Sequence, residues 1–118
     1  MARNTRASTA LIVSGASLSS IVWMPEHALV AIQIPSAWTA AAITFQGSTD
    51  GSTFGDLYDD GGTEVTIASA TVAASRTIVN GSILEKLAPL VAFKVRSGTT
   101  GTPVNQAADR SIAISVKE

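Results

Sequence analysis

Residues 38–60 read Trp-Thr-Ala-Ala-Ala-Ile-Thr-Phe-Gln-Gly-Ser-Thr-Asp-Gly-Ser-Thr-Phe-Gly-Asp-Leu-Tyr-Asp-Asp, and this stretch decides the fold. Ile43 and Phe45 alternate with polar neighbours, which is the period of a half-buried strand. Residues 48–52 then supply Ser, Thr, Asp and Gly, the residue types that form tight turns between strands. A second strand follows at residues 57–58. The stretch therefore predicts a strand, a tight turn and a second strand.

Strand patterns of the same kind recur along the rest of the chain, separated by short turn signals. Including the hairpin, the predicted strands lie at residues 9–13, 18–23, 28–34, 43–46, 57–58, 64–68, 77–79, 91–96 and 111–117. Eight or so short strands with turns every ~8–12 residues are typical of a sandwich or jelly roll. The prediction is an all-β, single-domain antiparallel β-sandwich, jelly-roll-like, at residues 8–118, preceded by a flexible N-terminal arm at residues 1–7. The best helical pattern is one turn at residues 82–87.

Composition bounds the core and excludes several classes of function. The chain has 118 residues, of which 46% are hydrophobic but only 5% aromatic, so one thin core of aliphatic side chains is expected. Charged residues are 14% and the net charge is −1, which gives no field that attracts nucleic acid or an anionic membrane. Cysteine is absent, which excludes disulfides, thiolate chemistry and cysteine-ligated metals. No apolar run approaches the roughly 20 residues of a membrane helix.

The densest group of acidic residues follows the hairpin turn. It consists of Asp50, Asp56, Asp59, Asp60 and Glu64. Calcium binds several oxygen ligands from one loop, but the spacing of these residues does not match the alternate ligand positions of an EF-hand. Aspartate also forms turns, because its carboxylate accepts hydrogen bonds from backbone N–H groups just ahead of it. The turn-forming interpretation is favoured, and no metal or other cofactor is predicted.

No set of residues has the spacing of a catalytic site. His27 is the only histidine, and no cysteine accompanies it as a zinc ligand. No serine lies in a nucleophile elbow. Gly47, Gly51 and Gly55 lack the following lysine and helix of a phosphate-binding loop, so they are interpreted as turn glycines. The chain is predicted not to be an enzyme, and no catalytic residue is assigned.

The candidates for contact with a partner are aromatic side chains and two arginines near the N-terminus: Arg3, Arg6, Trp23, Trp38, Phe54 and Tyr58. The two tryptophans lie at strand ends near prolines. Each either closes an end of the core or anchors a subunit contact or a sugar ring. The arginines lie on the predicted arm, which is either disordered or ordered only on a partner surface. Phe45 and Phe93, in contrast, are predicted core residues.

The hairpin also resembles segments of known families. Residues 42–54, with 57–59 behind them, look like a recurring segment in small structural proteins of tailed bacteriophages. The pattern Ser-x-Asp-Gly-x-x-Phe at residues 48–54 is similar to a hairpin common in galactose-binding-like and discoidin-like jelly rolls. Residues 91–97 and 110–116 are similar to the last two strands of such domains. The resemblance implies a β-sandwich and two classes of function.

The first class is a non-enzymatic structural protein of a phage virion, made in the bacterial host cytoplasm, which decorates or stabilises the capsid or another virion surface. Its expected partners are the major capsid protein, other virion proteins and further copies of itself, since many copies multiply weak contacts. The alternative is a carbohydrate-binding module of the discoidin or galactose-binding-like type. In that class the four aromatic candidates would supply a platform that stacks on a glycan.

Overall fold

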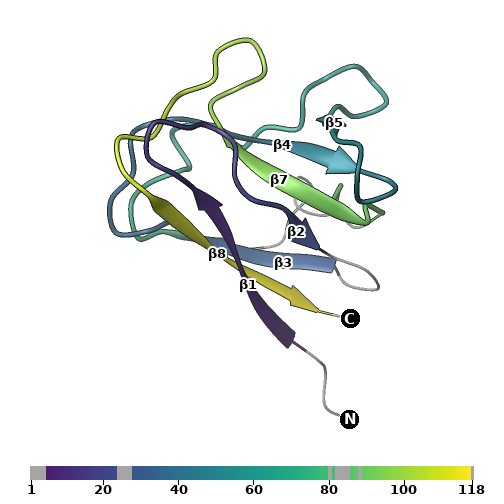
Figure 1. Ribbon diagram of the computed structural model, residues 1–118, viewed down its shortest axis with the longest axis horizontal. Helices are drawn as coiled ribbons and strands as arrows, with labels where there is room; N and C mark the ends of the chain where they lie inside the picture. Colours follow the sequence, from purple (N-terminus) through teal and green to yellow (C-terminus); the bar gives the residue numbers. More distant parts are fainter. Residues whose placement is uncertain (1–4, 24–27, 80, 82–85, 88, 118) are drawn as a thin grey trace.

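The computed structural model describes residues 5–23, 28–79, 81, 86–87 and 89–117 (Figure 1). These residues form strands and turns, and no helix occurs among them. The strands are β1 (Thr5–Ile12), β2 (Val22–Trp23), β3 (Ala28–Gln33), β4 (Ile43–Ser48), β5 (Gly55–Asp56), β6 (Thr77–Val79), β7 (Ala92–Ser97) and β8 (Arg110–Lys117). The helical turn predicted at 82–87 falls mostly outside the described residues, because 82–85 are among those not placed.

The strands form two antiparallel sheets that pack as a sandwich. Sheet A has the order β1-β8-β3-β6, and sheet B has the order β2-β7-β4-β5. Figure 1 shows β1, β8 and β3 side by side in one layer and β7 beside β4 in the other. The first strand pairs with the last, the second with the second last, and so on inward to β4 with β5. This is one long hairpin rolled into two sheets, so the predicted jelly-roll sandwich is confirmed.

The N-terminal strand begins earlier than the sequence suggests. β1 pairs with β8 over its whole length, from Thr5 opposite Lys117 to Ile12 opposite Arg110. Residues 5–7, which were assigned to a flexible arm, therefore belong to sheet A. The polar residues at the start of β1 do not prevent pairing, because backbone groups form the ladder and an antiparallel sheet needs only one apolar face. Residues 1–4 lie outside the described part of the chain.

Three predicted strands are shorter or displaced. The strand expected at 18–23 is reduced to β2 at Val22–Trp23, with an isolated bridge between Leu18 and Arg96. The strand expected at 57–58 is β5 at Gly55–Asp56, although Leu57 continues the contact by donating its N–H to the Phe45 carbonyl at 3.0 Å. The strand expected at 64–68 is reduced to isolated bridges, in which Glu64 pairs with Tyr58 and Ile67 with Ile43. Short segments that bridge at single positions carry too few ladder hydrogen bonds to count as strands.

The core lies between the sheets and is centred on two phenylalanines. Phe45 on β4 and Phe93 on β7 are fully buried, and their rings meet edge to face with centroids 6.0 Å apart. The isoleucines of sheet A pack against them from the other layer as part of one buried cluster. Both phenylalanines are thus confirmed as core residues. Alternation along each strand then fixes which side chains the two sheets present outward.

The described residues contain no helix long and apolar enough to cross a membrane.

Candidate functional site

The outer face of sheet A carries only uncharged side chains in the part of the sheet whose side chains are described. Ala10 and Ile12 on β1, Ile32 on β3, and Ile112 and Ile114 on β8 are buried in the core. Their neighbours along each strand therefore point outward. We call this outward set the uncharged face: Ala7, Thr9, Leu11, Ala31, Gln33, Thr77, Val79, Ser111, Ala113 and Ser115.

Strand register arranges the uncharged face in rows that run across the sheet. The first row, from β1 to β6, is Ala7, Ser115, Ala31 and Val79, and the second row is Thr9, Ala113, Gln33 and Thr77. A shorter third row pairs Leu11 with Ser111. The first row therefore has three small side chains followed by Val79 at the β6 edge, and in the second row the small Ala113 lies beside the larger Gln33.

A shallow groove of about 200 Å³ crosses the middle of the uncharged face. Ala7, Ala31 and Ala113 line it, and their short side chains leave the core residues Ile32 and Ile114 as part of its floor. Beside the groove, Val79 is 70% exposed. The face thus combines an apolar hollow with a projecting apolar side chain.

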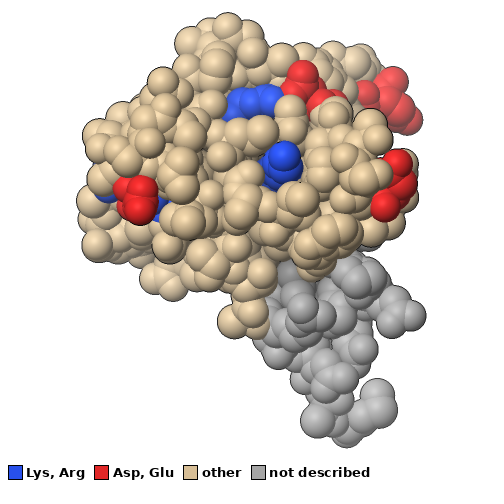
Figure 2. Space-filling model, viewed as in Figure 1, with Lys and Arg blue, Asp and Glu red and all other residues tan. Residues whose placement is uncertain are grey.

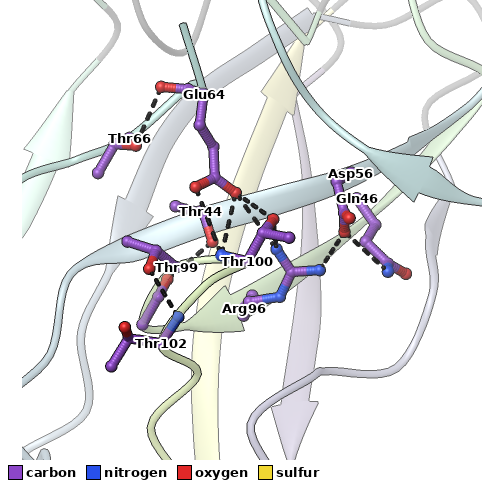
Figure 3. A network of polar contacts seen from close by, with 10 residues as sticks. Thr44, Gln46, Asp56, Glu64, Thr66, Arg96, Thr99, Thr100 and Thr102 are labelled. Atoms are coloured by element: carbon purple, nitrogen blue, oxygen red, sulfur yellow. Dashed lines mark hydrogen bonds and ion pairs between the residues drawn. The ribbon is translucent and has the colours of Figure 1, made fainter.

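The outer face of sheet B, in contrast, carries an ionic network centred on Arg96. The Arg96 side chain is only 8% exposed, and its guanidinium lies between two carboxylates (Figure 3). It donates to Asp56, to the Glu64 carboxylate at 3.4 Å and to the Thr100 hydroxyl at 2.7 Å. The Thr100 backbone N–H in turn donates to Glu64 at 3.2 Å. Arg96 therefore joins β5, the segment around Glu64 and the loop after β7.

Asp56 is held in its charged form by this network. The hydrogen bond from Arg96 lowers the pKa of Asp56, and a second hydrogen bond from the Gln46 amide at 3.3 Å lowers it further. One guanidinium faces two carboxylates, so the cluster leaves no unpaired positive charge for an anionic ligand. The cluster therefore acts as a clamp that joins β5, the segment around Glu64 and the loop after β7.

Two other acidic residues form turns. The Asp50 carboxylate accepts the N–H groups of Thr53 at 2.8 Å and Ser52 at 2.9 Å, and these bonds lower its pKa to about 2. Asp59 accepts the N–H groups of Thr63 and Gly61, and the bond from Thr63 is the main cause of its lowered pKa. The turn-forming prediction is confirmed for both residues.

The remaining acidic candidates behave differently from one another. Asp56 and Glu64 are partners of Arg96, a role that the sequence analysis missed. Asp60 is exposed at the loop tip. Within the described part of the chain, no group of three or more His, Cys, Asp or Glu side chains is placed to hold a metal ion.

The aromatic candidates do not form one platform. Trp23 and Tyr58 are each 49% exposed. The Trp23 ring lies against Gly51 in the loop between β4 and β5. Phe54 belongs to the same loop, and the Lys94 ammonium on β7 lies over its ring, 4.7 Å from the centroid. Figure 2 shows charged side chains mainly in the upper half of that view, over the region of β7, β4 and β5 in Figure 1.

Trp38 lies apart from the other aromatic candidates. It is half-buried, packs against the core, and its indole N–H donates to the Ala41 carbonyl at 3.4 Å. The structure therefore favours its role as a residue that closes one end of the core. Arg6 belongs to β1 opposite Val116, and Arg3 and His27 lie outside the described residues.

Gln106 is a structural residue that the sequence analysis missed. It is 1% exposed, and its amide donates to the Thr39 carbonyl at 3.0 Å and to the Ser97 hydroxyl at 2.7 Å. Its side-chain oxygen accepts the Thr39 N–H and the Arg110 Nε–H. All four hydrogen-bonding positions are used, which fixes three segments at one end of the sandwich. No sequence pattern marks a glutamine in an irregular segment as buried.

No protein-family model matches this chain, and a search of curated proteins finds no match. The fold and its two outer faces are therefore the observations on which a function is proposed.

Proposed function

We propose that this chain is a non-enzymatic structural subunit of a bacteriophage virion, which decorates or stabilises the capsid or another virion surface. The observation that carries the proposal is the uncharged face. An exposed antiparallel sheet normally presents polar and charged side chains to water. Charged residues are instead depleted at the centre of protein interfaces. A sheet face without a described Asp, Glu, Lys or Arg therefore suits burial against protein.

The architecture supports the same class. Jelly rolls with two four-stranded sheets recur in viral capsid proteins and in lectins, although fold alone does not assign function. The strand order of this chain is that of a jelly roll. Together with the resemblance of the hairpin to phage structural proteins, this favours a subunit that acts by shape and position.

The proposed partners are the major capsid protein or another virion protein, and the proposed location is the virion. A subunit of this size contributes a small contact area, and repetition around a particle multiplies weak contacts into stable attachment. The Arg96 clamp contributes rigidity to the loops of sheet B, so that the subunit keeps one shape when it is docked.

The test of this proposal is the composition of particles. Phage particles are induced from the host that carries the gene, purified by density gradient, and analysed by quantitative mass spectrometry. We expect the chain at a fixed ratio to the major capsid protein in every preparation. Its presence only in the soluble fraction, with none in the purified particles, contradicts the proposal.

A carbohydrate-binding module is the second candidate, favoured by the exposure of Trp23 and Tyr58 on the sheet B side. Exposed aromatic rings stack on sugars. A glycan array probes this function. Binding that is lost in Trp23→Ala and retained in Val79→Ala, which changes the opposite sheet, supports it, and an array without any bound glycan contradicts it.

A further inference from the structure

We propose that the uncharged face is a contact between two copies of this chain, related by a two-fold axis parallel to the strands. This inference rests on the proposed function in one respect, namely that protein covers this face. It adds the identity of the partner and the alignment of the two copies. The charge, the shape and the area of the face each bear on it.

The charge of the face selects a partner that is also uncharged. A charged side chain buried without a counter-ion costs several kcal/mol, so a surface that carries charges is disfavoured opposite this one. On the outer face of sheet B, Arg96 is already paired with Asp56 and Glu64, but the contact described for the Lys94 ammonium is with the Phe54 ring, so burial of that face would leave the Lys94 charge without a described counter-ion. A second uncharged face does, and like faces meet naturally about a two-fold axis.

The shape of the face complements itself under this symmetry. Rotation about an axis parallel to the strands keeps the rows but reverses their order. In the first row, Val79 of one copy then lies over Ala7 of the other, beside the groove. In the second row, Gln33 lies over Ala113. Large side chains of one copy therefore lie over small ones of the other. The strands of two stacked sheets run within about 30° of each other, so the rows of the two copies stay roughly aligned.

The area of the face sets the expected strength of the contact. Strands about 4.8 Å apart and rows about 6.6 Å apart give a face of about 400 Å². Two such faces bury about 800 Å², which is below the roughly 1,200–2,000 Å² of stable complexes. The pair is therefore a weak dimer that forms at the high local concentration on a particle and at high protein concentration in solution.

Chemical cross-linking between introduced cysteines tests the alignment directly, because the chain has no natural cysteine. Ala7→Cys and Val79→Cys are prepared as separate variants, mixed at high concentration, and treated with a short bismaleimide, which joins two thiols through a spacer. The spacer is needed because sheets stacked face to face lie about 10 Å apart, beyond the roughly 7 Å between Cα atoms that a direct disulfide allows. Because each variant carries a single cysteine, a cross-link between the two positions reports a contact between copies.

We expect the mixture to give a covalent heterodimer at a rate at least about tenfold above each variant alone. The control mixture pairs Ala7→Cys with Ala68→Cys, an exposed position outside the uncharged face. Introducing Ala113→Arg into both partners should abolish the cross-link, whereas Ala68→Arg should preserve it. Equal rates in the test and control mixtures, or no cross-link at all, overturn the proposal.

Sedimentation velocity of the natural chain gives an independent measurement that does not depend on any variant. The weight-average sedimentation coefficient should rise with concentration toward that of a dimer. A coefficient that stays at the monomer value up to millimolar concentration overturns the self-pairing. If sedimentation shows only monomer but the chain is found in purified particles, the self-pairing fails and the proposed function stands. If the dimer forms but the chain is absent from purified particles, the self-pairing stands and the proposed function fails.

Discussion

Arg96 on β7 reaches across β4 to hydrogen-bond Asp56 on β5, so a single side chain joins the two strands that flank β4 in sheet B. The short strand β5 has only two residues and pairs with β4 at two positions. Its place in the sheet therefore depends on side-chain contacts as well as on the backbone ladder. The ion pair supplies that contact, and Glu64 adds a second carboxylate from the other side.

Removal of Arg96 is predicted to destabilise the fold. In Arg96→Ala, Asp56 and the largely buried Glu64 lose their cation, and we expect the free energy of unfolding to fall by about 2–3 kcal/mol. Urea unfolding followed by fluorescence measures the change. Lys94→Ala on the same strand is the control, and it should cost less than about 1 kcal/mol because it loses only the contact with Phe54. Equal losses in the two variants contradict the clamp.

Stability is predicted to fall in acid between about pH 4 and pH 2. The folded pKa of Asp50 is about 2, against an ordinary value of 3.8, and the pKa values of Asp56 and Asp59 are also lowered. A carboxyl whose pKa is lower in the folded state contributes stability above its unfolded pKa and loses that contribution as the pH falls through the folded one.

The urea midpoint measured from pH 7 to pH 2 checks this dependence. It should be nearly level down to about pH 5 and then decline. Asp50→Asn should show a shallower decline, because the amide does not titrate but still accepts hydrogen bonds in the turn. A midpoint that rises below pH 4 is inconsistent with the lowered pKa values.

Gly51 is predicted to tolerate no side chain while Trp23 is present. Its φ is +85°, and an added Cβ would lie 2.5 Å from the Trp23 ring. We expect Gly51→Ala to lower the free energy of unfolding by about 1–3 kcal/mol through strain and steric overlap. Gly55→Ala, where nothing lies within 4 Å of the added atom, should change it by less than about 1 kcal/mol.

A double-mutant cycle separates the two causes at Gly51. In the Trp23→Ala background the overlap is gone and only the backbone strain remains, so Gly51→Ala should cost measurably less there. Additive effects of the two substitutions would show that the Trp23 ring does not restrict this turn.

Gln106 is predicted to be necessary for the end of the sandwich that contains Trp38. Gln106→Leu removes four hydrogen bonds and leaves buried partners such as the Ser97 hydroxyl unsatisfied. We expect a loss of about 2–3 kcal/mol in the free energy of unfolding. Asn105→Ala, at the exposed neighbouring residue, is the control. Its free energy of unfolding should stay within about 0.5 kcal/mol of that of the natural chain. Similar values for both variants would contradict the assigned role.

The sequence predicted the architecture because hydrophobic alternation and turn residues act locally. Ile43 and Phe45 face the core as their period requires, and the Asp50 turn follows from the chemistry of aspartate and glycine. The start of β1 was missed because residues 5–7 have no apolar alternation, and their pairing is dictated by β8, more than 100 residues along the chain.

The candidate surfaces were harder to predict, because they depend on which strands become neighbours. The acidic residues Asp50 and Asp56 look alike in sequence, yet one forms a turn and the other pairs with Arg96, 40 residues away. The uncharged face joins residues of β1, β8, β3 and β6, which meet only through the jelly-roll order. Each strand alone shows ordinary alternation, so the absence of charge across the described face appears only once the order is known.

We propose that the uncharged face holds this subunit in a particle through its contact with a second copy of the chain. The most direct measurement is the copy number of variant chains in purified particles, determined by quantitative mass spectrometry. Ala113→Arg places a charge in the middle of the face, and it should reduce the copy number at least about tenfold while leaving the soluble protein folded. Ala68→Arg adds the same charge elsewhere and should leave the copy number unchanged. Full incorporation of Ala113→Arg would contradict the account.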